Sequence, residues 1–412
     1  MDLNKLASAK ATSFSAFENF DPQRVASPAF VVDVRALEAN LAILSEVGKA
    51  SGAKILAALK AFSMHSAGEL FQQYLAGAAA SGPHEARLAR EYFAGEQGLV
   101  HTYSAAFKAD EFAEVLRYSD HVIFNSPSQL EKLSRAFDLD RSNHRFGLRV
   151  NPLHSEGAVG IYDPCRQGSR MGTPITQLQN AELGDFPLLT GLHFHTLCEQ
   201  GFDALDRTLA VIERSIPHWL EAAEWLNLGG GHHITAESYD RNALVQRLRE
   251  LRERYQLEIY LEPGEACSID SGLFIAEVLD VMENDGKIAI LDASATCHMP
   301  DVIEMPYTPD IIGARPCSKP TSNTSQQPSS ERVYTLGGPS CLTGDEIGRY
   351  HFNEPLTPGA RIKFLDMAIY SMVKTNTFNG IPLPDLVLWD SRDDRILHTR
   401  RFGYDDFKTR LS

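Results

Sequence analysis

The chain has 412 residues, 43% of them hydrophobic, and a formal net charge of −15. This length favours two domains over one compact core, and the acidic balance argues against a nucleic-acid partner, because phosphate binding needs a basic face. No window approaches 18 uninterrupted apolar residues, and residues 1–20 lack the basic flank and apolar run of a secretory signal. We therefore expect a cytoplasmic protein with no membrane partner.

The six cysteines form no CxxC pair and no spacing typical of metal ligands. The sequence therefore predicts reduced thiols and no bound metal, rather than a disulfide framework. The cysteines are Cys165, Cys198, Cys267, Cys297, Cys317 and Cys341.

Residues 1–27 are expected to form an extension that packs on a β-rich domain or is partly disordered. From Ala29, short apolar runs alternate with stretches of helical period. Because parallel strands need crossover helices, roughly eight such units predict a (β/α)8 barrel of the TIM type over residues 28–275. The strand candidates are PAFVVD, AKILAALKA, GAAASG, LVHTYSA, HVIFNS, RFGLRVNP, LLTGLHFH, WLNLGGG and LEIYLEPG.

The pattern then changes to strand-like segments separated by Gly, Pro and Asp turns, which predicts an antiparallel β-rich domain over residues 276–412. Residues 318–331 are polar and rich in Ser, Thr and Pro, as expected of an exposed loop. The strand candidates are FIAEVLDVME, GKIAILDAS, RVYTLGG, ARIKFLDM and DLVLWDS.

Lys60 ends the apolar run AKILAALKA. A partly desolvated ammonium there would have the lowered pKa that a Schiff-base nucleophile needs. Taken alone, a lysine that finishes a strand in water is the simpler interpretation.

Gly229, Gly230 and Gly231 follow another apolar run. Without side chains, their backbone N–H groups can approach a phosphate closely, although a plain tight turn would explain them too. His195, like His193, ends a predicted strand, where a satisfied core histidine is the ordinary interpretation.

Glu262 also ends a predicted strand, in IYLEPGEA. A buried carboxylate is costly unless it is paired, and a pyridinium N–H is one partner that would keep it ionised. In the β-rich domain, Cys341 and Asp345 lie in GPSCLTGDEIG, and Tyr370 lies in DMAIYSMVKTNTFNG. An inert cysteine and a half-buried tyrosine are the ordinary interpretations of Cys341 and Tyr370.

In this order, the segments resemble the fold-type III pyridoxal-phosphate enzymes, which include alanine racemase, ornithine decarboxylase and diaminopimelate decarboxylase. The resemblance covers roughly residues 28–400. It rests on the lysine strand, the histidine strand, the GGG loop and the EPG, GPxC, GD and FNG segments.

The resemblance implies that Lys60 binds pyridoxal 5'-phosphate covalently and that His195 stacks on the cofactor ring. It implies that Glu262 binds the pyridine nitrogen, and that the GGG loop holds the phosphate with help from the hydroxyl of Tyr370. The family's homodimers share their sites, so Cys341 and Asp345 are expected to serve the cofactor of the partner subunit. Cys341 would return a proton to the α-carbon after carbon dioxide leaves.

Within the family, the segments are most similar to the carboxynorspermidine and carboxyspermidine decarboxylases of polyamine biosynthesis. Glu265 follows EPG where many family decarboxylases carry arginine, and Leu197, Cys198 and Glu199 replace a Gly-Ser pair. The missing arginine disfavours a substrate with a distal carboxylate, such as diaminopimelate. Its absence leaves open which side chain neutralises the cofactor phosphate.

The implied substrate carries amines in its tail, so its pocket should offer carboxylates. The candidates are Asp301, Glu304 and Asp345, and solvated loop charges remain the alternative for the first two. Other functions also stay open: an ornithine or diaminopimelate decarboxylase, a non-catalytic regulatory homologue, or an unrelated phosphate-binding barrel. A racemase is disfavoured, because it would use a tyrosine base where this chain has GPSC.

Overall fold

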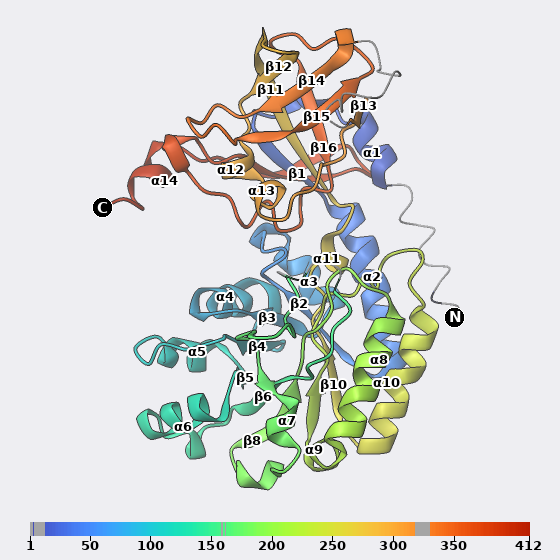
Figure 1. The fold of residues 1–412 in the computed structure, drawn as a ribbon, viewed down its shortest axis with the longest axis vertical. Coiled ribbons are helices and arrows are strands. Elements are labelled where there is room, and N and C mark those ends of the chain that lie inside the picture. The colour runs from blue at the N-terminus through green and yellow to red at the C-terminus, as the bar shows by residue number, and fades with distance from the viewer. Residues whose placement is uncertain (1–2, 4–12, 158–159, 161, 318–329) are drawn as a thin grey trace. The chain divides into compact units, whose positions relative to one another are not determined.

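The computed structural model describes residues 3, 13–157, 160, 162–317 and 330–412. Contacts divide the chain into two compact units. The first is built on Glu38–Cys267, and the second on Ser268–Ser412 together with the segment that ends at Leu37. Figure 1 shows both units along the chain from blue to red.

Eight parallel strands close into a barrel in the first unit, because β5 pairs with β6 as well as with β4. A short additional strand, β7 (Thr173–Pro174), pairs with β6. The predicted barrel is confirmed. Its strands are β2 (Lys54–Ala58), β3 (Gly77–Ala80), β4 (Leu99–Tyr103), β5 (His121–Phe124), β6 (Arg145–Asn151), β8 (Leu189–His193), β9 (Trp225–Asn227) and β10 (Glu258–Leu261).

Helices connect successive strands of the barrel, α2 precedes its first strand, and α11 follows its last. Helices α8 and α10 run side by side (Figure 1). Helix α6 begins where the Ser126 hydroxyl accepts a hydrogen bond from the Gln129 N–H, with proline in its first turn. The helices are α2 (Val34–Ser51), α3 (Gly68–Tyr74), α4 (Pro83–Leu88), α5 (Phe112–Tyr118), α6 (Pro127–Ala136), α7 (Ile175–Leu178), α8 (Phe202–Ser215), α9 (Pro217–Ala222), α10 (Arg241–Tyr255) and α11 (Glu265–Ser268).

Trp225 fills the interior of the barrel. A Cβ atom built on Gly147 in β6 would lie 2.3 Å from the Trp225 ring, and one built on Gly191 in β8 would lie 2.1 Å from it. The large ring therefore depends on two neighbouring strand positions that carry no side chain. It packs with Leu56, Ala79, Ile123 and Tyr260.

The second unit contains a mixed sheet in the order β13-β15-β14-β12-β11-β1-β17-β18, and β16 also pairs with β11. The sequence predicted an antiparallel domain. Two pairings, β1 with β17 and β12 with β14, are parallel, so the sheet is mixed. The strands are β1 (Ala29–Asp33), β11 (Gly272–Glu283), β12 (Lys287–Leu291), β13 (Ala314–Pro316), β14 (Val333–Gly337), β15 (Glu346–Phe352), β16 (Arg361–Leu365), β17 (Asp385–Asp390) and β18 (Arg395–Arg400).

Short helices complete the second unit. Helix α12 begins where the Ser294 hydroxyl accepts a hydrogen bond from the Cys297 N–H. The helices are α1 (Ser13–Asn19), α12 (Ala295–His298), α13 (Asp301–Glu304) and α14 (Tyr404–Lys408).

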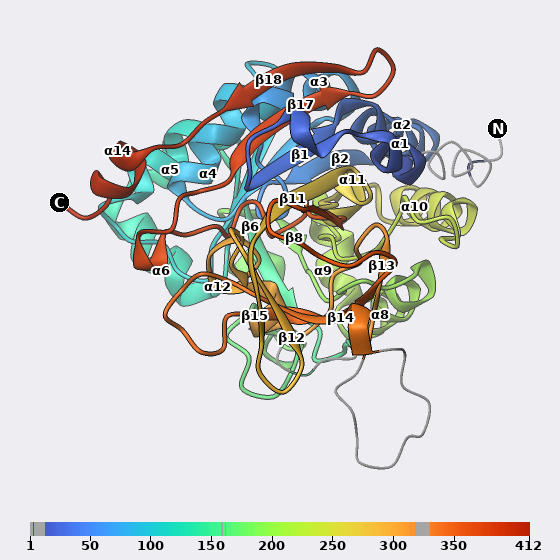
Figure 2. The same ribbon diagram turned by 90° about the horizontal axis from the view of Figure 1, so that it is seen from above.

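Strand β1 does not open the barrel, contrary to the sequence-based prediction. It pairs with β11 and β17 in the sheet of the second unit, as Figure 2 also shows. All five of its residues are buried, and a continuous apolar run looks the same in a barrel as in the centre of a mixed sheet. The units divide after Cys267, whereas the predicted barrel extended to residue 275.

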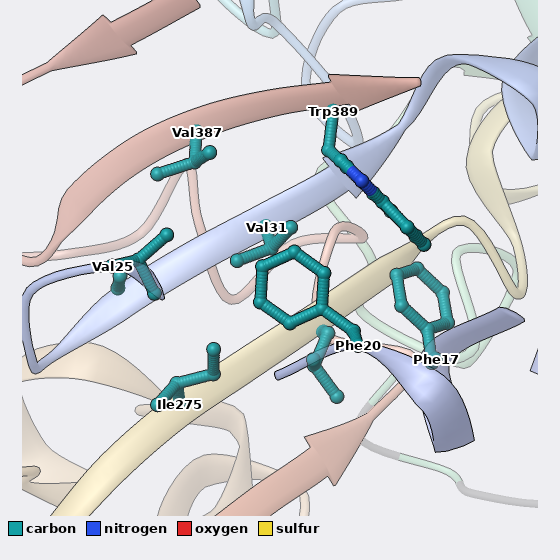
Figure 3. Packing of buried hydrophobic residues seen from close by; sticks show 9 residues of the cluster. Phe17, Phe20, Val25, Val31, Ile275, Val387 and Trp389 are labelled. Atoms are coloured by element: carbon teal, nitrogen blue, oxygen red, sulfur yellow. The ribbon is translucent and has the colours of Figure 1, made fainter. Parts of the chain in front are cut away.

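The described part of the N-terminal extension packs on the β-rich unit. Phe17 and Phe20 are buried, and their ring centroids lie 5.9 and 4.9 Å from that of Trp389 in β17 (Figure 3). Val31 and Ile275 belong to the same cluster. Most of the predicted loop, residues 318–329, lies outside the described residues.

None of the described helices is long and apolar enough to cross a membrane. Among the described residues, no group of three or more His, Cys, Asp or Glu side chains is arranged to hold a metal ion. All six cysteines are unpaired thiols.

Candidate active site

The predicted barrel residues meet where β8, β9 and β10 end. His193 is paired in register with Asn227, and Asn227 with Tyr260. Because parallel strands end at the same edge of the barrel, the residues just beyond them, His195 and Glu262, lie at that edge as well.

The Lys60 amine lies 3.4 Å from His195 Nε2. The lysine side chain is solvent-accessible, but surrounding protein atoms still desolvate its amine. This desolvation lowers the pKa of Lys60, and the nearby Arg149 guanidinium lowers it further. A larger share of the amine is therefore in the neutral, nucleophilic form.

His195 is held in one tautomer by the glycine loop. Its Nδ1 accepts a hydrogen bond from the Gly230 N–H at 2.9 Å. Burial and the adjacent Lys60 amine hold the pKa of His195 well below its usual range. The ring is therefore neutral with its proton on Nε2, the nitrogen that faces Lys60, and this arrangement suits a neutral amine.

Glu262 is a partly buried carboxylate with a partner on each oxygen. Oε1 accepts from Asn227 Nδ2 at 2.7 Å, and Oε2 lies 3.3 Å from His193 Nε2. Desolvation acts to raise the pKa of Glu262, but His193, Asn227 and Lys60 together outweigh it and leave this pKa below its usual value. Glu262 is therefore ionised and keeps acceptor capacity for a further N–H donor.

The glycine loop is packed against neighbouring backbone at all three positions. A Cβ atom would lie 2.5 Å from the Phe194 oxygen at Gly229, 2.0 Å from the Glu262 oxygen at Gly230, and 1.9 Å from the Leu197 oxygen at Gly231. Gly229 and Gly231 also have φ angles of 66° and 85°. Side chains are thus excluded, and the loop presents backbone at the strand ends.

Arg149 and Tyr103 join the site, although neither was predicted from the sequence. The Arg149 guanidinium lies 4.5 Å from the centroid of the Tyr103 ring and donates to the His195 carbonyl at 3.1 Å. Tyr103 in turn stacks on His193, with ring centroids 5.6 Å apart. Only the position of Arg149 near the end of a predicted strand could have suggested a role.

Glu265, which stands where arginine is common in the family, is paired with His233, and Nε2 lies 2.6 Å from Oε2. Partial burial raises the pKa of Cys198, and the carboxylates of Glu199 and Glu265 raise it further. This side of the site therefore combines carboxylates with an imidazole rather than a guanidinium.

In the second unit, Cys341 is exposed and donates its backbone N–H to Asn379 Oδ1 at 2.9 Å. Asp345 is buried, and its carboxylate accepts from the Ser294 hydroxyl at 2.8 and 3.0 Å and from the Thr296 N–H at 3.2 Å. Asp345 therefore holds the first turn of α12 and the serine that caps it.

The structure brings three other predicted residues together. The Lys374 amine forms ion pairs with Asp301 and, at 3.1 Å, with Glu304. The same amine lies 6.0 Å from the centroid of the Tyr370 ring. Two of the three carboxylates predicted to bind substrate amines thus contact an ammonium of their own unit, whereas the third, Asp345, contacts Ser294 and Thr296.

The barrel residues fit pyridoxal 5'-phosphate on three counts. Lys60 offers an amine of lowered pKa, and Glu262 offers an ionised carboxylate for a ring nitrogen. Residues 229–231 offer a turn of bare backbone, because a Cβ at any of the three positions would clash with its neighbours. These groups match the aldehyde, the pyridine nitrogen and the phosphate.

The family model described as "Pyridoxal-dependent decarboxylase, C-terminal sheet domain" matches residues 29–368. The chain is 39% identical to carboxynorspermidine/carboxyspermidine decarboxylase of Campylobacter jejuni, over 94% of this chain and 99% of that protein. It is 37% identical to carboxyaminopropylagmatine decarboxylase of Synechocystis sp., over 93% and 95%.

Among solved structures, carboxynorspermidine decarboxylase from Campylobacter jejuni complexed with norspermidine superposes with a TM-score of 0.83. It is 38% identical in sequence, and the match covers 94% of this chain and all of that chain. The family match, the full-length relatives and the fold agree with the geometry of the site: this chain belongs to the pyridoxal-dependent decarboxylases.

Proposed function

We propose that this enzyme, a carboxy-lyase, converts carboxynorspermidine or carboxyspermidine to norspermidine or spermidine and carbon dioxide. The observation that carries the proposal is the 39% identity, over 94% of the chain, to a decarboxylase named for both substrates. The reaction would supply a triamine in polyamine biosynthesis. Six unpaired thiols support a reducing, cytoplasmic setting.

The barrel residues would hold the cofactor and orient the substrate. When bound, pyridoxal 5'-phosphate supplies the sink for the electron pair that the departing carbon dioxide leaves behind. The Lys60 amine would form the covalent link to the cofactor, which its lowered pKa supports. His195 would lie against the cofactor ring, and the ionised Glu262 would keep the ring nitrogen protonated.

The phosphate would lie on the backbone N–H groups of Gly229, Gly230 and Gly231, with the Tyr370 hydroxyl as a further donor. Backbone N–H groups of a glycine turn can form an anion site without a cationic side chain. The Gly229 and Gly230 N–H groups donate to Asn227 Oδ1 and His195 Nδ1, so they would share or exchange these hydrogen bonds on binding a phosphate. This arrangement supports phosphate binding by a chain that has Glu265 in place of an arginine.

The β-rich unit would complete the site. Cys341 would return a proton to the α-carbon of the product, and its exposure leaves the thiol accessible for that role. Asp301 and Glu304 would bind the amine tail of the substrate, joining or replacing the contact with Lys374. Asp345 would support the site through the turn that it holds.

We infer that the active form is a homodimer in which the β-rich unit of each subunit serves the barrel of the other. Mixing Lys60→Ala subunits with Cys341→Ala subunits tests this sharing. Each mixed dimer would contain one intact site, so an equal mixture that exchanges subunits freely should recover roughly a quarter of the wild-type rate. A mixture no more active than its components would contradict shared sites.

A substrate panel tests the reaction. Carbon dioxide release should be fastest with carboxynorspermidine or carboxyspermidine, and Lys60→Ala should abolish both turnover and the absorbance of covalently bound cofactor. The panel should include carboxyaminopropylagmatine, because a relative 37% identical is named for that substrate. Preference for ornithine or diaminopimelate, or a Lys60→Ala variant that keeps its band and turnover, would refute the proposal.

A further inference from the structure

Asn227 is the last residue of β9, is fully buried, and contacts two parts of the candidate site with one side chain. Its Nδ2 donates to Glu262 Oε1 at 2.7 Å, and its Oδ1 accepts the Gly229 N–H at 2.9 Å. Glu262 and Gly229 belong to the loops that follow different strands. Only a side chain with a donor at one end and an acceptor at the other can make both contacts.

The orientation of this amide is fixed by its partners. The Gly229 N–H needs an acceptor, so it must face Oδ1, and the ionised Glu262 needs a donor, so it must face Nδ2. His101 Nδ1 lies 3.2 Å from Nδ2 and can accept the second hydrogen. Burial holds the pKa of His101 well below its usual range, so its ring is neutral, and Nδ1 accepts in the tautomer that carries the proton on Nε2.

We propose that Asn227 is a positioning residue that couples the two polar ends of the cofactor site. This inference rests on the proposed function, in which Glu262 binds the ring nitrogen and the glycine loop binds the phosphate. Asn227 sets the spacing between Glu262 and Gly229. Its Nδ2 is a neutral donor, so it favours the ionised form of Glu262. Because it carries no charge, it leaves the negative charge of Glu262 to pair with a cationic ring nitrogen.

Replacement of Asn227 by aspartate separates these two tasks. Asn227→Asp keeps an oxygen for the Gly229 N–H but places a second carboxylate against Glu262. Two adjacent carboxylates share a proton, because the charge of one raises the pKa of the other. We expect the variant to bind pyridoxal phosphate with an affinity within about fivefold of wild type, since the loop is retained.

The shared proton should alter the chemistry at the ring nitrogen. At neutral pH, we expect kcat of Asn227→Asp to fall by about tenfold or more, while KM changes by less than about threefold. Both kcat and the absorption spectrum of the bound cofactor should show an additional ionisation and move toward wild type as the pH rises. A purely structural role would not produce this pH dependence.

Asn151→Asp is the matched control. Asn151 is also a buried asparagine that ends a barrel strand, but its side chain caps the Leu153 N–H and contacts the Pro164 carbonyl. If Asn227→Asp does not fold, Asn227→Ser tests the same coupling. The shorter serine side chain cannot span both partners, so cofactor affinity should fall at least about tenfold, and the spectrum of the cofactor that remains bound should differ from wild type.

The outcomes distinguish this inference from the proposed function. A wild-type protein that binds no pyridoxal phosphate would overturn the function itself. If wild type binds the cofactor, an Asn227→Asp variant with unchanged kcat, spectrum and pH profile would overturn only the role of Asn227. For Asn227→Ser, the overturning result is an affinity and a spectrum equal to those of wild type.

Discussion

Gly230 offers a steric test of the glycine loop. Its φ lies outside the left-handed region, so alanine is conformationally allowed there, unlike at Gly229 and Gly231. The added Cβ would lie 2.0 Å from the Glu262 carbonyl oxygen and 2.9 Å from its carbonyl carbon. Both are backbone atoms, so Gly230→Ala must displace either the loop or the end of β10 by about 1 Å or more.

The displacement should weaken both the fold and the cofactor site. Overpacking of this kind costs about 1–3 kcal/mol, which corresponds to a fall in Tm of about 2–12 °C for a unit of this size. If displacement of the loop costs one charge-assisted contact between its backbone and the phosphate, binding weakens by about 1.5–3 kcal/mol, so Kd for pyridoxal phosphate should rise about 10- to 150-fold. His195 would also lose the N–H that fixes its tautomer.

Cofactor titration of the stripped protein, followed by absorbance, measures this Kd, and thermal unfolding measures Tm. Gly184→Ala is the control, because Gly184 is exposed, has an ordinary φ, and a Cβ added there would meet open space. A Gly230→Ala variant with Kd within about twofold of wild type and an unchanged Tm would refute the steric argument.

Two further predictions concern catalysis and stability. Replacing Cys341 with alanine should slow product formation while cofactor binding stays intact, and an unchanged rate would remove the thiol from the mechanism. Burial lowers the pKa of His121 to about 3, so below pH 6.5 the unfolded chain binds a proton that the folded chain does not. The contribution of the neutral His121 ring to the free energy of unfolding is therefore complete above that pH, and it should fall by about 2 kcal/mol between pH 7 and pH 5. His121→Phe should therefore lose less Tm on acidification than wild type or the exposed-site control His84→Asn, and an equal loss in all three would contradict this reasoning.

The barrel was predictable because its strands are apolar runs separated by helical patterns, and that signal depends only on local sequence. The membership of β1 was not predictable, because burial on both faces gives the same pattern in either unit. The place of Trp225 also depends on Gly147 and Gly191, which face it from other strands. No local pattern links these three positions.

For the site, motif order indicated Lys60, His195, Glu262 and the glycine loop, and the structure brings them together at one edge of the barrel. The contacts that tune them were not predictable. In the sequence, Asn227 is only the residue that lies two positions before Gly229. Its role depends on the Glu262 carboxylate, which lies 35 positions away. The pairing of Asp301 and Glu304 with Lys374 is likewise a long-range contact, formed across about 70 residues.

The electrostatics of the barrel end connect stability with chemistry. Desolvation lowers the pKa values of His101, His193 and His195, so neutral rings surround the ionised Glu262. A protonated His193 would pair with Glu262 and compete for the charge that a cationic ring nitrogen requires. Under the proposed function, the burial that makes these histidines costly in acid would therefore also keep the Glu262 carboxylate available to the cofactor. It follows that the acid loss of stability should begin at a higher pH than the acid limb of cofactor binding, because the first follows the ordinary pKa of these histidines in the unfolded chain and the second follows their lowered pKa in the folded protein.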